Sequence, residues 1–320
     1  MNVYRFLKDW SLPIAMLGGV VAYLFYVELD LSPANRSVVV RTVEFVQPML
    51  IFLMLFITFC KVRVEELRLK RWHCGLLIIQ LLSLVLLSMI LFLFPSLSLE
   101  VKVLIESAML CLICPTATAA AVITARLGGS AASLISYTIL INLAVACATP
   151  FFLTLIHPVE GETFLQSFML IMGKVFPLLL CPLVSAQILR FIFPTLHRYV
   201  VEHGRNWPFY LWLVALALAI AVTARAIAHT PLSLLVLVGI AVVSLVCCLL
   251  QFAVGRYIAA GCGEKITGGQ ALGQKNTVFA IWLAYTFLTP VTAIAGGFYS
   301  LWHNIVNTYQ LYRHNHNSSG

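Results

Sequence analysis

Long apolar runs separated by short charged, proline- or glycine-containing segments make up almost the whole chain. With a window of about 19 residues, this pattern predicts ten membrane-spanning helices, at 11–29, 39–60, 72–94, 101–127, 131–156, 166–193, 207–228, 232–257, 264–289 and 290–312. A helix needs about 20 mainly apolar residues to cross the hydrocarbon core of a bilayer. The first run lacks a small-residue cleavage site, so we interpret it as a membrane helix rather than a signal peptide.

Composition agrees with an all-α membrane protein. Of the 320 residues, 61% are hydrophobic and 10% are charged, whereas a soluble domain carries about 25% charged residues. The mean hydropathy is +0.98. The sequence has no phosphate-binding loop, hydrolase elbow or His-Glu metal helix. The Cys-x-x-C formed by Cys111 and Cys114 has no second pair at zinc-ligand spacing. We therefore expect neither an enzyme nor a bound cofactor or metal.

The net charge of +8 comes from basic residues in the short segments between apolar runs, which favours a topological signal over nucleic-acid binding. If the ten spans alternate, four basic residues lie on one side of the membrane: Arg36, Arg41, Lys102 and Arg225. Lys174 and Lys275 lie within spans. The other fourteen share the side of the N-terminus: Arg5, Lys8, Lys61, Arg63, Arg68, Lys70, Arg71, Arg126, Arg190, Arg198, Arg205, Arg256, Lys265 and Arg313. We expect cytoplasmic termini and a cell membrane, most simply a bacterial inner membrane.

The fourth and ninth predicted spans are interrupted by proline, glycine and polar residues, at 115–118 and 268–277. They hold the same place in two five-helix halves, which predicts inverted repeats at 1–160 and 161–316, followed by a tag or linker remnant at 317–320. Paired broken helices mark the substrate site of such folds, because free backbone groups are tolerated in a bilayer only where they face protein, water or ligand. Alternatively, Pro115 only kinks a packed helix and the glycines allow close packing.

Lys275 is the leading candidate for a functional residue, because an ammonium at membrane depth costs at least about 2.5–3.5 kcal/mol. Alternatively, it snorkels to an interface or only stabilises the helix crossing. Other polar side chains at membrane depth complete the candidate substrate site, although each could instead satisfy helix backbone: Gln274, Asn276, Thr277, Thr116, Thr118, Gln80, His303 and Asn304. Lys102 and Glu106, one turn apart near a span end, are expected to form a surface ion pair.

Two short motifs resemble those of a known transporter family. The segment 114–122, Cys-Pro-Thr-Ala-Thr-Ala-Ala-Ala-Val, and the segment 273–277, Gly-Gln-Lys-Asn-Thr, are similar to the fourth- and ninth-helix motifs of the bile acid:sodium symporter (BASS) family. Further matches are 54–61 with 64–66, Gln80, and 302–305. The resemblance implies ten helices in two inverted repeats. Helices one, two, six and seven would form a panel, and the other six a core in which the broken helices cross. It also implies alternating access and organic anions as substrates, such as bile acids, pantoate or other carboxylates.

The departures from the family pattern concern sodium. Where sodium-coupled members have Ser-Asn in the fourth helix, this chain has Ala120 and Ala121; where they have Glu and Gln in the ninth, it has Ala271 and Lys275. Sodium requires several oxygen ligands, so we expect no sodium site. Our hypothesis is a sodium-independent carrier of a small organic anion, in which Lys275 replaces a sodium ion by bonding broken-helix carbonyls and Gln80.

The sequence leaves two other functions open and disfavours a third. One is a non-transporting membrane receptor or sensor with a transporter fold. Another is proton coupling, in which Lys275 loses and regains a proton in each cycle and is the main titrating candidate. A sodium/proton antiporter is disfavoured, because it needs buried carboxylates and we expect none in the broken spans.

Replacing Lys275 with Gln is expected to lower the stability or the transport rate of the protein, because the built-in cation is lost. The substitution by itself is not expected to create sodium dependence. Thermal unfolding and transport of the Lys275→Gln variant in sodium and in potassium measure both effects. Normal stability and activity in this variant would contradict the hypothesis.

Overall fold

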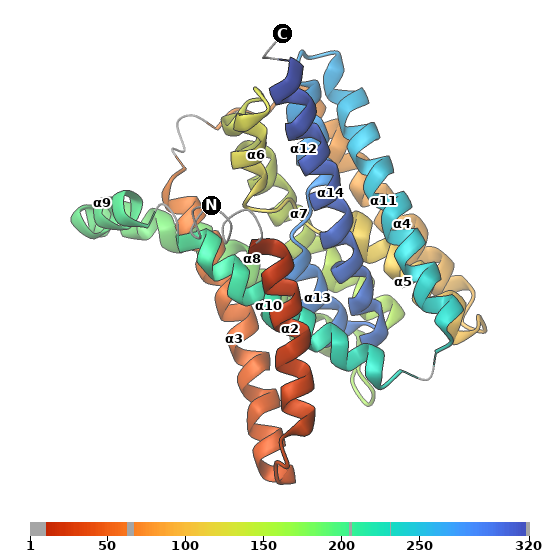
Figure 1. The fold of residues 1–320 in the computed structure, drawn as a ribbon. Coiled ribbons are helices and arrows are strands. Elements are labelled where there is room, and N and C mark those ends of the chain that lie inside the picture. The colour runs from red at the N-terminus through yellow and green to blue at the C-terminus, as the bar shows by residue number, and fades with distance from the viewer. Residues whose placement is uncertain (1–10, 63–66, 205–206, 231, 318–320) are drawn as a thin grey trace. The chain divides into compact units, whose positions relative to one another are not determined.

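The computed structural model describes residues 11–62, 67–204, 207–230 and 232–317. In these ranges the chain folds into thirteen α-helices and one 3-10 turn, with no β-strand (Figure 1). Several residues used above lie outside the described residues: Arg5, Lys8, Arg63, Arg205, the motif 64–66 and the terminal segment 318–320.

Within the described ranges, six helices are long and apolar enough to cross a membrane, as expected of a multi-pass membrane protein. They are α3 (Pro33–Cys60), α4 (Arg71–Leu93), α7 (Ala131–Ile156), α8 (Phe164–Ile192), α10 (Trp207–Ala228) and α11 (Leu234–Ala260). The other four predicted spans correspond to the shorter α2 (Ser11–Glu28), to the polar-ended α14 (Ala293–Asn317), and to two interrupted segments. The total of ten spans therefore stays a prediction.

Both interruptions expected from the sequence are present as breaks between short helices, but the second is confined to 274–276, since residues 268–273 are helical. The first separates α5 (Leu99–Ile113) from α6 (Ala120–Arg126), and the second separates α12 (Lys265–Gly273) from α13 (Thr277–Phe287). A residue before proline avoids the helical conformation, and Cys114, before Pro115, has an extended ψ of 139°. The second break contains no proline.

One helix was not expected. α9 (Pro194–His203) lies between α8 and α10 and has no buried residue. It meets the C-terminal end of α3, where Nε2 of His197 donates to the carbonyl of Cys60 at 2.8 Å. The hydropathy window missed this helix because its ten residues are short and half polar.

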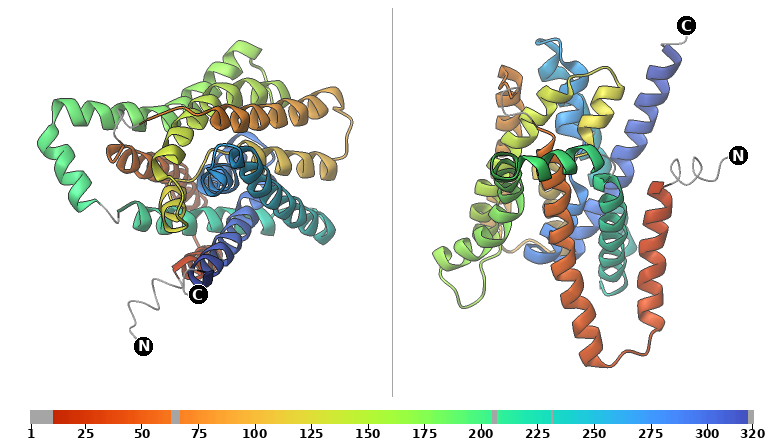
Figure 2. Two further views of the ribbon diagram at one scale, coloured as in Figure 1. Left: turned by 90° about the horizontal axis from the view of Figure 1, so that it is seen from above. Right: turned by 90° about the vertical axis from the view of Figure 1, so that its left-hand side faces the viewer.

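The chain divides into two compact units. The first comprises Met1–Lys61 and Cys181–Pro231. In this unit α10 lies between α2 and α3 and packs against both (Figure 2). Ala15 of α2 and Leu216 and Ile220 of α10 form its buried apolar cluster.

The second unit comprises Val62–Leu180 and Leu232–Gly320 and contains all four short helices of the two broken segments. α4 packs against α5 and α7, and α11 packs against α5, α12 and α14. The approach of α12 to α11 depends on glycine. A Cβ atom on Gly268 would collide with the Cβ of Ala259 and with the carbonyl oxygen of Gly255.

We expect Gly268→Ala to destabilise the protein by about 1–3 kcal/mol, because the added methyl group overpacks the α11–α12 contact. The matched control is Gly173→Ala in α8, where an added Cβ meets nothing within 4 Å. That variant should be neutral or slightly more stable. Thermal unfolding in detergent measures both, and equal melting temperatures for the two variants would contradict the close-packing argument.

Candidate functional site

The two helix breaks lie against each other in the second unit. Thr116 and Lys275 form an isolated antiparallel bridge. The amide of Ala117 donates to the carbonyl of Gln274, and the amide of Asn276 donates to the carbonyl of Pro115, each at 2.9 Å. We call residues 114–119 and 274–276 the break contact. Each broken helix thus supplies partners for backbone groups that the other leaves free.

Lys275 is at the centre of the break contact and is 2% exposed. Its Nζ donates to the carbonyl of Leu112, in the last turn of α5, at 3.2 Å. In the described part of the chain, no carboxylate lies within ion-pair distance of this ammonium. The expected bond from Lys275 to a broken-helix carbonyl is therefore present, and its positive charge is met by a backbone dipole rather than by an acid.

Gln80 of α4 is a further hydrogen-bond donor to the carbonyls at the end of α5. Its Nε2 lies 3.0–3.2 Å from the carbonyls of Leu112, Ile113 and Cys114. Its Oε1 accepts a hydrogen bond from the hydroxyl of Tyr137 on α7. The expected direct bond between Gln80 and Lys275 is not found; instead, both donate to the carbonyl of Leu112.

A second glutamine–tyrosine pair serves the other break. Nε2 of Gln251 on α11 donates to the carbonyl of Cys111 at 3.0 Å and to the hydroxyl of Tyr299 on α14 at 2.9 Å. That hydroxyl donates to the carbonyl of Gly273, the last residue of α12, at 2.8 Å. In each half, the helix before the break supplies a glutamine and the helix after it supplies a tyrosine. Every carbonyl from Cys111 to Pro115 accepts a hydrogen bond.

The other candidates at the break contact divide into two groups. The hydroxyl of Thr116 donates to the carbonyl of Ala271 at 2.7 Å, and the side chain of Asn276 caps α13 by accepting from the amide of Phe279 at 3.2 Å. These two side chains hold the breaks in shape. By contrast, Thr277 and Gln274 are buried without a side-chain hydrogen bond among the described residues, and Oε1 of Gln274 is left unpartnered.

Several predicted residues are not brought into this hydrogen-bond network. Thr118 is half-buried and makes no side-chain hydrogen bond in the described ranges. Asn304 donates to the carbonyl of Ser300 in its own helix, at 2.7 Å. His303 is buried, and its ring contacts that of Tyr299 edge-on. Ala120 and Ala121 begin α6 and offer no side-chain oxygen.

The expected Lys102–Glu106 surface pair is wrong. Glu106 is 1% exposed. Its carboxylate accepts from the hydroxyl of Thr292 at 2.7 Å and from the amide of Thr289 at 3.2 Å, and it pairs with Nε2 of His157 at 2.8 Å. The expectation that the broken spans hold no buried carboxylate is therefore wrong as well. Residue spacing along one helix could not show that His157 and the segment with Thr289 and Thr292 surround Glu106.

Sequence reasoning missed Gln251, Tyr137 and Tyr299. Gln251 had a signal, because it is an amide in an otherwise apolar run, as Gln80 is. The tyrosines had none, because a tyrosine among apolar residues is ordinary in a membrane helix.

Among the described residues, no group of three or more His, Cys, Asp or Glu side chains is arranged to hold a metal ion. No family model matches the chain, and no curated protein matches it at a significant level.

We expect Thr116→Val to destabilise the protein by about 0.6–1.7 kcal/mol, the range for interhelical hydrogen bonds in membrane proteins, because the carbonyl of Ala271 loses its partner. Thr118→Val removes a hydroxyl two residues away that makes no such bond, so its effect should be smaller. Thermal unfolding of the two purified variants makes the comparison. A larger loss for Thr118→Val would mean that the Thr116 hydroxyl does not hold the breaks together.

Proposed function

We propose that this protein is a secondary transporter of a small organic anion, that it works by alternating access, and that it does not use sodium. The ammonium of Lys275 takes the place of a bound cation at the break contact. The observation that carries the proposal is the position of Lys275, buried where two broken helices meet and bonded to a helix-end carbonyl.

The hydrogen bonding around the breaks supports sodium independence. A sodium ion needs several free oxygens, but the carbonyls from Cys111 to Pro115 already accept hydrogen bonds from Lys275, Gln80, Gln251 and Asn276. Ala120 and Ala271 add no side-chain oxygen. A tethered ammonium keeps the positive charge at this point constant through the cycle, whereas a diffusible ion would bind and leave.

The two compact units support a moving mechanism. Alternating access requires one rigid body to move against another around a binding site. The second unit holds both broken segments, and the first holds α2, α3, α9 and α10 with the end of α8. This grouping has the form that the BASS resemblance assigns to core and panel, and we propose the same roles here.

The glutamine–tyrosine pairs support two related halves. Tyr137 and Tyr299 are each the seventh residue of their helices, which begin at Ala131 and Ala293. Each pairs with a glutamine from the helix that precedes the break. We propose inverted repeats on this basis, with both termini cytoplasmic.

Proton coupling is a second candidate, now favoured by a specific observation. The buried carboxylate of Glu106, on the helix that leads to the first break, pairs with the imidazole of His157, which directly follows α7. A proton exchanged at this pair would change the contacts of Glu106 with Thr289 and Thr292, just before α14. Proton transfer at Lys275 remains the alternative route.

Reconstitution into liposomes tests the proposal. We expect saturable uptake of at least one carboxylate from a panel of organic anions, at the same rate with sodium or potassium as the only cation, because no sodium site is required. Lys275→Gln should lower this uptake severalfold. The matched control is Lys265→Gln, which removes an exposed ammonium from the first residue of α12. An imposed pH gradient separates uniport from proton coupling.

Each other result has a definite meaning. Uptake that occurs only in sodium would contradict the built-in cation. Anion binding without uptake would make the protein a receptor with a transporter fold. Equal loss in the Lys265→Gln and Lys275→Gln variants would show that the position of Lys275 is irrelevant.

A further inference from the structure

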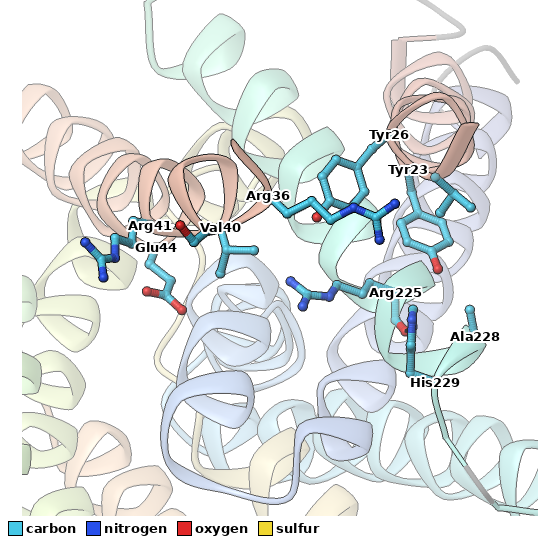
Figure 3. Close-up of a pocket in the computed structure, with 11 residues that line it drawn as sticks. Tyr23, Tyr26, Arg36, Val40, Arg41, Glu44, Arg225, Ala228 and His229 are labelled. Carbon is cyan, nitrogen blue, oxygen red and sulfur yellow. The ribbon is translucent and has the colours of Figure 1, made fainter. Parts of the chain in front are cut away.

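A cavity of about 690 Å³ lies within the first unit, between α2, α3 and α10. Its walls come from the end of α2, the first turns of α3 and the end of α10 (Figure 3). The volume falls in the range of about 300–1,000 Å³ that is typical of small-molecule sites.

The cavity concentrates positive charge. Arg36, Arg41 and Arg225 line it, and Glu44 is the one carboxylate among the described lining residues. No carboxylate lies within ion-pair distance of any of the three guanidinium groups in the part of the chain that the structure describes. Arg225 is half-buried in the last turn of a candidate membrane helix, where an unpaired cation is costly.

This concentration runs against the charge pattern of the chain. Basic residues are sparse on the side opposite the termini in the predicted topology, which carries four of the twenty Lys and Arg residues. Topology alone disfavours cations there. Three of those four nevertheless line one cavity, although they come from two helices far apart in the sequence. Orientation in the membrane does not explain this gathering, whereas recognition of an anion does.

Two tyrosines shape the cavity for an organic ligand. In Figure 3 the guanidinium of Arg36 lies beside the rings of Tyr26 and Tyr23, and the side chain of Arg225 extends below Arg36 toward Val40 in the same cavity. The guanidinium of Arg41 points away from them. A guanidinium can bind a carboxylate through two parallel hydrogen bonds, and the tyrosine rings offer apolar faces to the rest of the molecule.

We propose that this cavity is a binding site for an organic carboxylate, in which Arg36 and Arg225 hold the carboxylate and Tyr23 and Tyr26 contact its apolar body. The site captures the transported anion from the side opposite the termini. This role rests on the proposed transport function. The binding itself does not.

The test combines binding and transport of two radiolabelled carboxylates, pantoate and cholate. The protein is held in nanodiscs of zwitterionic lipid for binding and in liposomes for uptake. In the double variant Arg36→Gln/Arg225→Gln we expect the Kd and the KM to rise by about tenfold or more, because two charge-assisted contacts are lost. Arg198→Gln, which removes an exposed cation from α9 in the same unit, should change neither constant.

A further variant guards against misfolding. Arg225→Lys should lose less affinity than Arg225→Gln because it keeps the positive charge, although its ammonium cannot form the two parallel hydrogen bonds of a guanidinium. Parent-like Kd and KM in the double variant would overturn the capture site while leaving the transport proposal intact. If the parent takes up neither probe, the transport proposal fails for these anions, and loss of probe binding in the double variant still supports the site.

The lipid is the competing source of an anion. Anionic phosphatidylglycerol added to the nanodiscs shares the charge of the probes. Two results would overturn the proposal. In the first, the parent retains phosphatidylglycerol, the double variant does not, and neither carboxylate displaces this lipid. In the second, the parent binds neither probe. Displacement of the lipid by a carboxylate supports the proposal.

Discussion

The structure of the second unit depends on one constraint: backbone groups that lose their helical partners inside an apolar bundle must find other hydrogen-bond partners. The end of α5 and the end of α12 each leave carbonyls without the amide that a continuous helix would supply. No water is available at membrane depth to replace it. The two breaks solve this by meeting, so that Ala117 and Asn276 donate across the break contact. Further carbonyls at the two breaks accept hydrogen bonds from two glutamines, a tyrosine, a threonine and Lys275.

This arrangement gives Lys275 a structural role, because its Nζ donates to a helix-end carbonyl where both broken helices meet. In the proposed function the same group would supply a positive charge that favours a nearby anion without a diffusible cation. The close packing of α12 on α11 through Gly255 and Gly268 holds one side of this contact in register.

The two units divide the chemistry differently. In the second, carbonyls at the end of α5 accept hydrogen bonds from side chains of the same unit, which favours a rigid element. In the first, the cavity beside α2, α3 and α10 has three guanidinium groups with no carboxylate at ion-pair distance among the described residues. This difference suits the proposed carrier, in which the first unit would meet an anionic ligand and the second would keep its shape during movement.

The sequence by itself determined the membrane class and the places of both helix breaks, and it singled out Lys275 and Gln80, which the structure brings together at the end of α5. These follow from local rules: hydropathy over about 20 residues, the effect of Pro115 on Cys114, and the cost of polar groups in lipid. Only the tertiary structure decided that Glu106 is buried with His157, that Tyr137 and Tyr299 pair with glutamines, and that Arg36 and Arg225 share a cavity. Each of these depends on contacts between helices distant in sequence. Apolar runs specify that helices pack in the membrane but leave their neighbours and rotation open, because lipid and protein interior are equally apolar.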